Sequence, residues 1–204
     1  FVVSHDPDAR RVAGVDRPIA ATRLDEVRRW RTHNERQPLP TLEEVLTELP
    51  PVPLSIDLKP ARAGHVAPLL EVIVRHDAAH RVTMASFHDR LVFAARRLGY
   101  PGPTALTRLE VLTARLLPTA LTRALLRGTA AQIPVRGGPL RLDGAGFIRR
   151  CRRVGLRVDY WVVNDPTQAR ELLRRGATGL MSDDPARLAP VVEAERARRG
   201  EGSR

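Results

Sequence analysis

The sequence has one cysteine, one lysine and few aromatic residues, and it contains no long hydrophobic run. Aromatic residues make up 4% of its 204 residues. The lone Cys151 cannot form an internal disulfide, and the six histidines show no metal-ligand spacing, so a histidine or cysteine metal cluster is excluded. No apolar stretch approaches the roughly 20 residues that cross a bilayer, which excludes a transmembrane segment.

The chain is rich in charged residues, and positive charges outnumber negative ones. Lys and Arg number 34 against 23 Asp and Glu, a formal net charge of +11, and every cation except Lys59 is arginine. The arginines are spread along the whole chain, mostly on helix-like segments, and few aromatic side chains are available to stack on bases. We therefore expect no specific nucleic-acid binding. An arginine-driven polyanion binder stays open as an alternative.

Short apolar strands alternate with amphipathic helices. Capping signals mark several helix starts, namely the Thr41 to Glu44 capping box, Asp143, Asp165 before Pro166, and Asp184 before Pro185. The alternation predicts parallel βα units. The predicted strands cover residues 1–4, 54–58, 82–86, 104–106, 130–135, 158–163 and 179–182.

The fold class that fits this order is α/β, of the (β/α)8 TIM-barrel type. Such a barrel takes roughly 250 residues, so we expect an incomplete barrel of about six βα units that lacks its first two strands and first helix. We place the barrel domain at residues 1–193 and a charged, frayed tail at residues 194–204. The chain begins without Met. We expect a cytoplasmic location, and a signal peptide upstream of Phe1 stays open.

Polar residues follow the predicted strands, where the reacting groups of a parallel βα fold gather. Asp57 and Lys59 alternate with Leu54, Ile56 and Leu58. If the three apolar side chains pack against helices, the carboxylate and the ammonium point to the barrel mouth, where a hard cation and a phosphate could be held. A salt bridge without a ligand is the alternative.

An ordered series of motifs resembles the glycerophosphodiester phosphodiesterases. Each block is weak alone, but six in the right order at βα spacing are a strong signal, and they cover nearly the whole chain. The blocks are FVVSHD at residues 1–6, LPTLEEVL at 39–46, LSIDLK at 54–59, ASF at 85–87, VDYWVVN at 158–164 and GLMSDDP at 179–185.

The resemblance implies roles for particular residues. His5 matches a histidine that acts as general acid or base, Asp57 a carboxylate ligand of a divalent cation (Ca²⁺ or Mg²⁺), and Lys59 a phosphate contact. Asp57 stands where the family has Glu, and its reach is one methylene shorter. Phe87, Trp161 and Asn164 match residues that line the substrate pocket, and Asp159 stands where a histidine is often found.

The implied activity is metal-assisted hydrolysis of a glycerophosphodiester to an alcohol and glycerol 3-phosphate. The family's first catalytic histidine, its adjacent arginine and a pair of acidic ligands precede the FVVSHD block and have no match here, so we expect this fragment alone to be inactive. The alternatives are a non-catalytic member that binds phosphodiesters or a protein partner, and a related phospholipase. The small-molecule phosphodiester is the expected partner; the released alcohol, the cation and the oligomeric state stay open.

Overall fold

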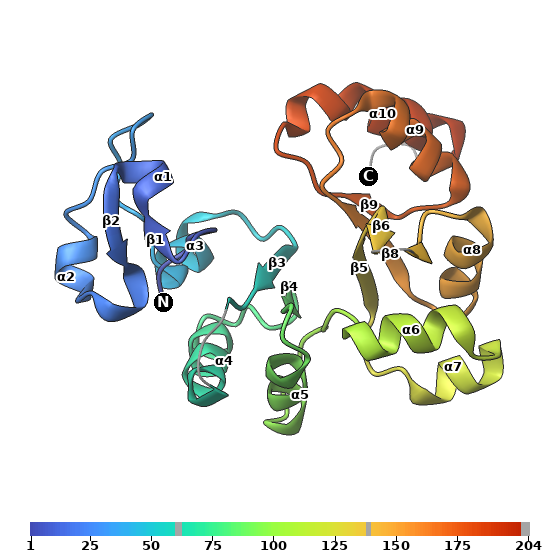
Figure 1. The fold of residues 1–204 in the computed structure, drawn as a ribbon, viewed down its shortest axis with the longest axis horizontal. Helices are drawn as coiled ribbons and strands as arrows, with labels where there is room; N and C mark the ends of the chain where they lie inside the picture. The colour runs from blue at the N-terminus through green and yellow to red at the C-terminus, as the bar shows by residue number, and fades with distance from the viewer. Residues whose placement is uncertain (60–62, 138–139, 201–204) are drawn as a thin grey trace. The chain divides into compact units, whose positions relative to one another are not determined.

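The computed structural model describes residues 1–59, 63–137 and 140–200. The chain divides into two compact units, Phe1–Gly102 and Pro103–Arg204, and each is described here by itself (Figure 1). The domain boundaries expected from the sequence stay a prediction. In chain order the first unit contains β1 (Asp8–Ala9), α1 (Arg10–Ala13), β2 (Val15–Pro18), the 3-10 turn η1 (Ile19–Ala21), α2 (Leu24–Val27), α3 (Leu42–Glu48), β3 (Leu54–Asp57), η2 (Ala63–His65), α4 (Val66–Arg75), β4 (Val82–Ala85) and α5 (Asp89–Arg97).

A parallel strand pair, β3 and β4, forms the centre of the first unit. The register runs from Leu54 opposite Val82 to Asp57 opposite Ala85. Leu54, Ile56 and Leu58 belong to the hydrophobic cluster that includes buried side chains of α4 and α5. Because side chains alternate along a strand, Asp57 and Lys59 lie on the face away from these helices, as the sequence pattern predicts.

The beginning of the chain differs from the expectation. Residues 1–4 were expected to form a parallel strand, but only Val2 is in a β-bridge, which is antiparallel to Thr41. The backbone of this segment is hydrogen-bonded to residues 40–42, since Val3 N donates to Pro40 O and Leu42 N donates to Phe1 O. β1 and β2 then form an antiparallel pair, and this part of the unit has a small core of its own, formed by Ala9, Val27, Trp30 and Leu39.

The second unit is built on a three-stranded parallel sheet in the order β5, β8, β9. Ala105 adds an isolated parallel bridge to Ala130 at the edge of β5. The elements of this unit are α6 (Arg108–Leu116), α7 (Thr119–Leu125), β5 (Ala130–Pro134), β6 (Arg136–Gly137), β7 (Leu140–Arg141), α8 (Ala145–Arg153), β8 (Arg157–Trp161), α9 (Pro166–Arg175), β9 (Gly179–Leu180) and α10 (Pro185–Arg198).

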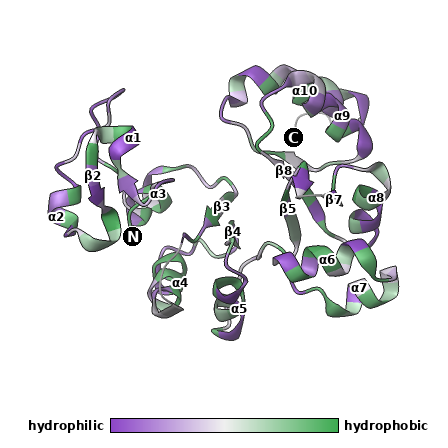
Figure 2. Ribbon diagram, viewed as in Figure 1, coloured by the Kyte–Doolittle hydropathy of each residue, from purple (hydrophilic) through white to green (hydrophobic). Residues whose placement is uncertain are grey.

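The core of the second unit lies between this sheet and its helices. Val158 and Tyr160 of β8 are fully buried in one hydrophobic cluster with Ile148 of α8 and Leu172 of α9. The hydropathy colouring shows the same division, with apolar positions of α8 and α9 on one side of each helix (Figure 2). As in the first unit, alternation leaves Asp159 and Trp161 on the other face of the sheet.

Most helix starts follow the capping signals in the sequence. Thr41 and Glu44 form a capping box, and Asp165 and Asp184 cap α9 and α10. The expected start at Asp143 is wrong, since Gly144 is the N-cap of α8 and provides no side-chain cap. The carboxylate of Asp143 is used elsewhere, because Arg141 and Arg175 both donate to it.

The charged segment from residue 194 is not frayed over its described part. Helix α10 continues to Arg198, and Glu195 is buried there. Glu195 accepts hydrogen bonds from Arg174 Nε at 3.0 Å and from Arg198 Nε at 2.7 Å, which ties the end of α10 to α9. Residues 201–204 of the expected tail lie outside the described residues.

Asp143 gives a stability prediction. Hydrogen bonds from Arg141 are the main reason that the pKa of this carboxyl lies below its usual value of 3.8, and Arg175 adds to them, while burial opposes the shift. A depressed pKa in the folded state contributes stability above about pH 4 that is lost as the pH falls through the folded-state pKa. We expect Asp143→Asn to lower the free energy of unfolding by about 1–2 kcal/mol at neutral pH.

The same variant should also show a shallower loss of stability below pH 4, measured by urea unfolding across the acid range. The exposed Asp25, which pairs with Arg23 two residues away, supplies the control variant Asp25→Asn. An acid dependence of Asp143→Asn that matches the natural chain would contradict the prediction.

Candidate functional site

Asp57 and Lys59 form an ion pair at the carboxyl end of β3. Lys59 Nζ lies 2.8 Å from Asp57 Oδ2, and both side chains are partly exposed. An ammonium has three N–H donors, and this contact occupies one of them. The pair can therefore accept a further anionic ligand at Lys59 without giving up its own contact.

The second oxygen of Asp57 has an unusual environment. Asp57 Oδ1 is buried and has no hydrogen-bond partner among the described residues. A buried acceptor without a partner costs about 1–3 kcal/mol, and a carboxylate oxygen is a ligand that Ca²⁺ and Mg²⁺ prefer. Asp57 thus fits one ligand position of a hard cation. Within residues 1–59, 63–137 and 140–200, no group of three or more His, Cys, Asp or Glu side chains could hold a metal ion by itself.

Phe87 lies beside the same pair. The register of β3 and β4 places residue 59 next to residue 87, and Lys59 Nζ is 5.8 Å from the centre of the Phe87 ring, within range of a cation–π contact. Ser86 fixes the intervening backbone, because its Oγ donates to Leu58 O at 2.7 Å and accepts from His88 N at 3.1 Å. The structure therefore brings together three of the predicted residues, Asp57, Lys59 and Phe87.

His5 is held by its neighbour. The His5 Nδ1 donates to Asp6 Oδ1 at 2.6 Å, and the other oxygen of Asp6 accepts from Arg11 Nε at 2.7 Å. These two hydrogen bonds, that from His5 first, keep the pKa of Asp6 below its usual value. An ionised carboxylate only accepts, so the His5 Nδ1 carries the proton and Nε2 is left for proton exchange.

Asp6 and Arg11 are site residues that the sequence interpretation missed. His5 and Asp6 follow the strand predicted at residues 1–4, and strand alternation gives no information on side chains beyond the end of the strand. The chain bends at residues 5–7. The His5 side chain is 75% exposed, and no hydrogen bond or ion pair joins it to Asp57 or Lys59 in the part of the chain that the structure describes.

Trp161 and Asn164 lie in the second unit, at the end of β8 and just beyond it. Asn164 connects the ends of β8 and β9. Its Oδ1 accepts from Ser182 Oγ at 2.9 Å and from Asp183 N at 3.0 Å, and its Nδ2 donates to Asp183 Oδ2 at 2.8 Å. Most of the hydrogen-bonding capacity of this amide is therefore used to join the two strand ends, and a substrate contact by Asn164 stays a prediction.

Asp159 lies on the same face of β8 as Trp161 and is bound within the protein. Its Oδ2 accepts from Arg157 Nη2 at 2.8 Å, and its Oδ1 accepts from Thr178 Oγ1 at 3.0 Å. Gly179 makes this arrangement possible, since a Cβ there would come within 2.6 Å of Asp159 Oδ1. Asp159 therefore stabilises the β8–β9 pair.

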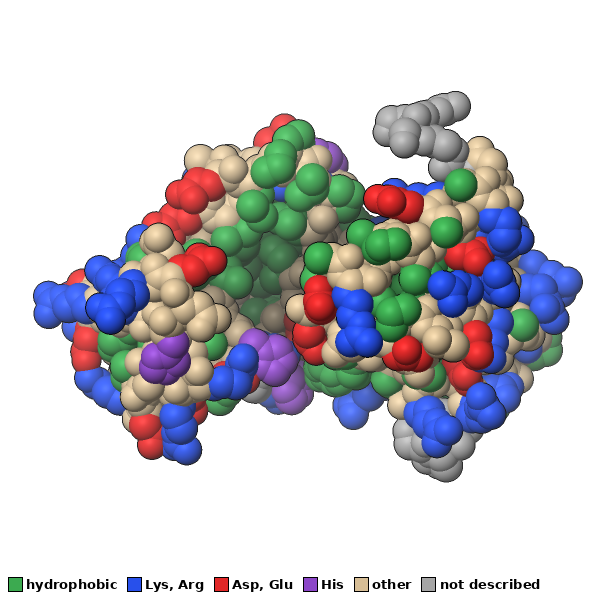
Figure 3. Space-filling view, turned by 90° about the horizontal axis from the view of Figure 1, so that it is seen from above, with side chains coloured by type: hydrophobic (Ala, Val, Ile, Leu, Met, Phe, Trp, Pro, Cys, Tyr) green, Lys and Arg blue, Asp and Glu red, His purple; other side chains and the backbone are tan. Residues whose placement is uncertain are grey.

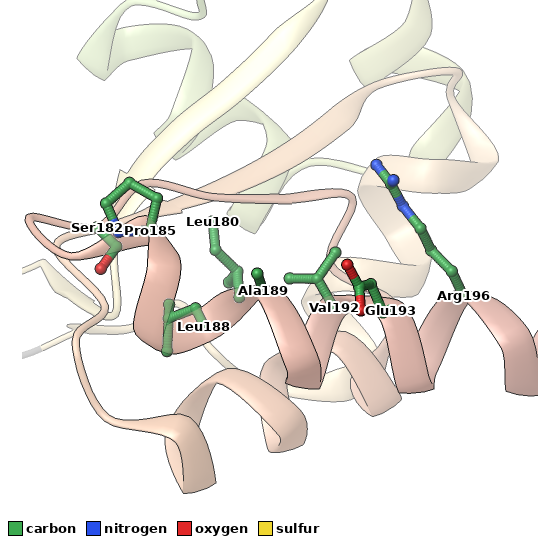
Figure 4. Close-up of a pocket in the computed structure, with 8 residues that line it drawn as sticks. All are labelled: Leu180, Ser182, Pro185, Leu188, Ala189, Val192, Glu193 and Arg196. Carbon is green, nitrogen blue, oxygen red and sulfur yellow. The ribbon is translucent and has the colours of Figure 1, made fainter. Parts of the chain in front are cut away.

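Two surface pockets of the described residues are lined by none of the predicted site residues. One pocket of about 240 Å³ lies between Leu180 and one side of α10, where Leu188, Ala189 and Val192 form an apolar floor (Figure 4). Charged side chains on the face seen in Figure 3 are mixed in sign, with Asp and Glu between the Lys and Arg side chains of both units. This mixed distribution gives no support on that face to a polyanion-binding function.

None of the helices that the structure describes is long and apolar enough to cross a membrane. A model of the glycerophosphoryl diester phosphodiesterase family matches residues 1–187. A protein of Mycobacterium tuberculosis described as a probable glycerophosphodiester phosphodiesterase 2 is 34% identical over 207 residues, which cover 95% of this chain and 74% of that protein.

Solved structures give the same fold. A glycerophosphodiester phosphodiesterase from Parabacteroides distasonis matches with a TM-score of 0.72 at 20% identity, over 97% of this chain and 79% of that one. An Oleispira antarctica phosphodiesterase, solved in complex with the product sn-glycerol-3-phosphate, matches with a TM-score of 0.70 at 20% identity, over 94% of this chain and 78% of that one. These likenesses confirm the expected TIM-barrel type of fold, although the strand pairs of the described residues do not close into a barrel.

Proposed function

The chain belongs to the glycerophosphoryl diester phosphodiesterase family, a family of phosphoric diester hydrolases, and we propose that it hydrolyses glycerophosphodiesters at a site built on Asp57, Lys59 and His5. The products are an alcohol and glycerol 3-phosphate. The sn-glycerol-3-phosphate bound to the Oleispira antarctica phosphodiesterase, which shares the fold, supports this choice of substrate class.

One observation carries the proposal, and it is the arrangement at the end of β3. A carboxylate with one buried, unpartnered oxygen and an ammonium with spare donors lie side by side on the strand face away from the helices. A structural salt bridge needs neither feature, because it is complete when each charge meets the other. A site for a cation together with a phosphate needs both.

In this proposal Asp57 Oδ1 would hold a divalent cation, and water or the substrate would supply further ligands. When bound, the cation neutralises charge that develops on the phosphoryl oxygens. Lys59 contacts another phosphoryl oxygen and holds the diester in place, while its contact with Asp57 keeps the ammonium at the strand end. The exposed ring of Phe87 borders the ammonium and keeps part of it from water.

His5 exchanges the proton that the hydrolysis requires. Water adds to phosphorus, the bond from phosphorus to the alcohol oxygen breaks, and the leaving oxygen needs one proton. His5 Nε2 exchanges a proton at the leaving or the attacking oxygen, and Asp6 stabilises the charged imidazole at Nδ1.

The test is product release by the natural full-length protein. We expect glycerol 3-phosphate from glycerophosphocholine or glycerophosphoglycerol in Ca²⁺ or Mg²⁺, and none after chelation. Asp57→Asn removes a negative ligand, so the cation concentration for half-maximal rate should rise about 10- to 100-fold. The affinity for the cation, measured by calorimetry without substrate, should fall in parallel.

Asp16→Asn is the matched control, because Asp16 is exposed and pairs with Arg10 in the same unit. An unchanged cation affinity in Asp57→Asn would remove Asp57 from the metal site. The absence of glycerol 3-phosphate with every cation and both substrates would overturn the proposed activity.

A further inference from the structure

Two helices of the second unit present an unusual surface, called here the hairpin face. It consists of five leucines on α6 and α7 that are each 41% to 68% exposed. On α6 they follow the spacing i, i+3, i+7, which places them along one stripe of the helix. The hairpin face comprises Leu109, Leu112 and Leu116 of α6 and Leu121 and Leu125 of α7.

The leucines of the hairpin face are not the buried positions of the two helices. On α7 the buried side chain is Thr122, whose Oγ1 lies 3.1 Å from Pro118 O at the start of its own helix, 3.2 Å from Leu117 O and 3.5 Å from Thr113 O. On α6 the buried positions are Glu110 and Ala114. Most exposed leucines in soluble proteins stand singly, whereas a row such as the three on α6 marks an interaction surface.

The charges around the hairpin face are of one sign. Arg115, Arg123 and Arg127 are exposed, and they form no ion pair within the described ranges. The only acidic residue of the segment 107–127 is Glu110, which is buried with its carboxylate accepting from Thr107 N, Arg127 N and Gly128 N. On α9 and α10, by contrast, Arg174 and Arg198 are paired with Glu195.

We propose that the hairpin face docks on the surface of a lipid bilayer that carries anionic headgroups. Leucines with cations beside them, and no exposed acid, match the apolar boundary and the negative surface of such a bilayer. Helices of nine and seven residues lie in the interface and do not span it. If a second copy of the chain bound this face through the same face, arginines would lie against arginines and repel each other. If a nucleic acid bound it, the arginines would contact phosphates but the leucines would have no apolar partner.

The hairpin face contains none of the residues assigned to the hydrolytic site. Within the second unit, Glu110 binds the backbone of Arg127 and Gly128, so α6 begins beside the start of β5, whereas Trp161 lies at the end of β8. The inference therefore goes beyond the proposed function: docking brings the enzyme to the bilayer, and hydrolysis of a water-soluble diester does not require it.

The experiment is co-sedimentation of the natural full-length protein with vesicles of phosphatidylcholine alone and of equal parts phosphatidylcholine and phosphatidylglycerol. We expect binding to the anionic vesicles that weakens with salt. The triple variant Arg115→Gln, Arg123→Gln, Arg127→Gln should lose about 100-fold in affinity, and Leu112→Ser with Leu116→Ser and Leu121→Ser should lose at least as much.

Matched control variants test whether vesicle binding depends on the residues of the hairpin face or on exposed arginines and leucines in general. Arg149→Gln, Arg152→Gln and Arg153→Gln remove three exposed cations from α8, and Leu24→Ser, Leu49→Ser and Leu98→Ser remove three exposed leucines of the first unit. Both should leave vesicle binding and its salt dependence unchanged. Equal losses in hairpin and control variants would overturn the proposal, as would a natural protein that ignores anionic vesicles.

Two further readouts separate the competing explanations. If the leucine variant converts a dimer to a monomer in gel filtration and the natural protein binds no vesicles, the hairpin face is a contact between copies and the proposal fails. Hydrolysis of soluble glycerophosphocholine should be the same in the natural and hairpin variants. A natural protein that binds anionic vesicles but releases no glycerol 3-phosphate would count against the proposed function and leave docking in place. A hairpin variant that loses hydrolysis together with vesicle binding would count against a separate docking surface.

Discussion

Replacing His5 by alanine is expected to lower kcat for glycerophosphodiester hydrolysis by about 10²- to 10⁴-fold, the range that a positioned proton-transfer group contributes. The physical reason is the orientation of the imidazole. Asp6 holds Nδ1 at 2.6 Å, and Nε2 is the ring nitrogen left to meet the substrate. Because the side chain is largely exposed, its loss creates no cavity and the fold should be unaffected.

Asp6→Asn separates orientation from proton transfer. An amide at this position still offers an oxygen to Nδ1, but it no longer stabilises a charged imidazole by its own charge. We expect a smaller loss of kcat than in His5→Ala, with KM unchanged, because the amide oxygen still orients the ring. A purely structural role for Asp6 would lower the thermal stability and leave kcat unchanged.

The control for both variants is His80→Ala, which removes an exposed histidine of the same unit. Full-length variants are compared by steady-state release of glycerol 3-phosphate, and by circular dichroism to verify folding. A His5→Ala enzyme that keeps more than a tenth of the natural kcat would exclude His5 as the proton-transfer group.

Features with a regular period could be predicted from the sequence. Leu54, Ile56 and Leu58 alternate with Asp57 and Lys59, and a strand has only two faces, so packing of the leucines and isoleucine against helices fixes where the charges point. Helix starts at Thr41, Asp165 and Asp184 follow for a similar reason, because a capping side chain acts on backbone within three residues.

Features that depend on a bend or on distant partners could not be predicted in this way. The His5–Asp6 contact depends on the bend at residues 5–7, and the backbone partners that hold the preceding segment lie near residue 40. Asn164 resembles a substrate contact by motif, but its amide is used by Ser182 and Asp183, which follow another strand. No local sequence pattern predicts that Asn164 pairs with Ser182 and Asp183.

One missed element did leave a local signal. The segment of α6 begins with Thr107 and Glu110 in a capping box, which is the same signal that predicts α3. The leucines that follow have helical spacing, yet they are exposed rather than buried. Hydrophobic period identifies a helix face, but burial depends on what packs on that face, and the sequence alone does not contain that information.

Replacing Lys59 by glutamine is expected to lower kcat/KM by about 10²- to 10³-fold, the cost of removing one preorganised donor from a developing oxyanion. Lys59 is held on two sides, by Asp57 Oδ2 at 2.8 Å and by the Phe87 ring at 5.8 Å, so its ammonium is aligned before substrate binds. Glutamine keeps a polar N–H donor on a side chain that is one atom shorter, and it loses the charge that the phosphoryl group requires.

Lys59→Arg sharpens the test, because every other cation of the chain is arginine. A guanidinium is planar, larger and more weakly hydrated than an ammonium, and it would bind Asp57 through two parallel hydrogen bonds. That geometry occupies Asp57 Oδ1, the oxygen assigned to the cation. We therefore expect Lys59→Arg to need more Ca²⁺ or Mg²⁺ for half-maximal rate, whereas Lys59→Gln changes the rate at saturating cation.

The matched control is Arg90→Gln, which removes an exposed cation of α5 in the same unit. It should leave both kcat/KM and the cation concentration for half-maximal rate unchanged. If Lys59→Arg restores the natural kcat/KM with an unchanged cation requirement, a positive charge of any shape is enough, and the assignment of Asp57 Oδ1 to a cation loses its support. If Lys59→Gln is as active as the natural protein, the ion pair at the end of β3 is a structural contact and the phosphate is bound elsewhere.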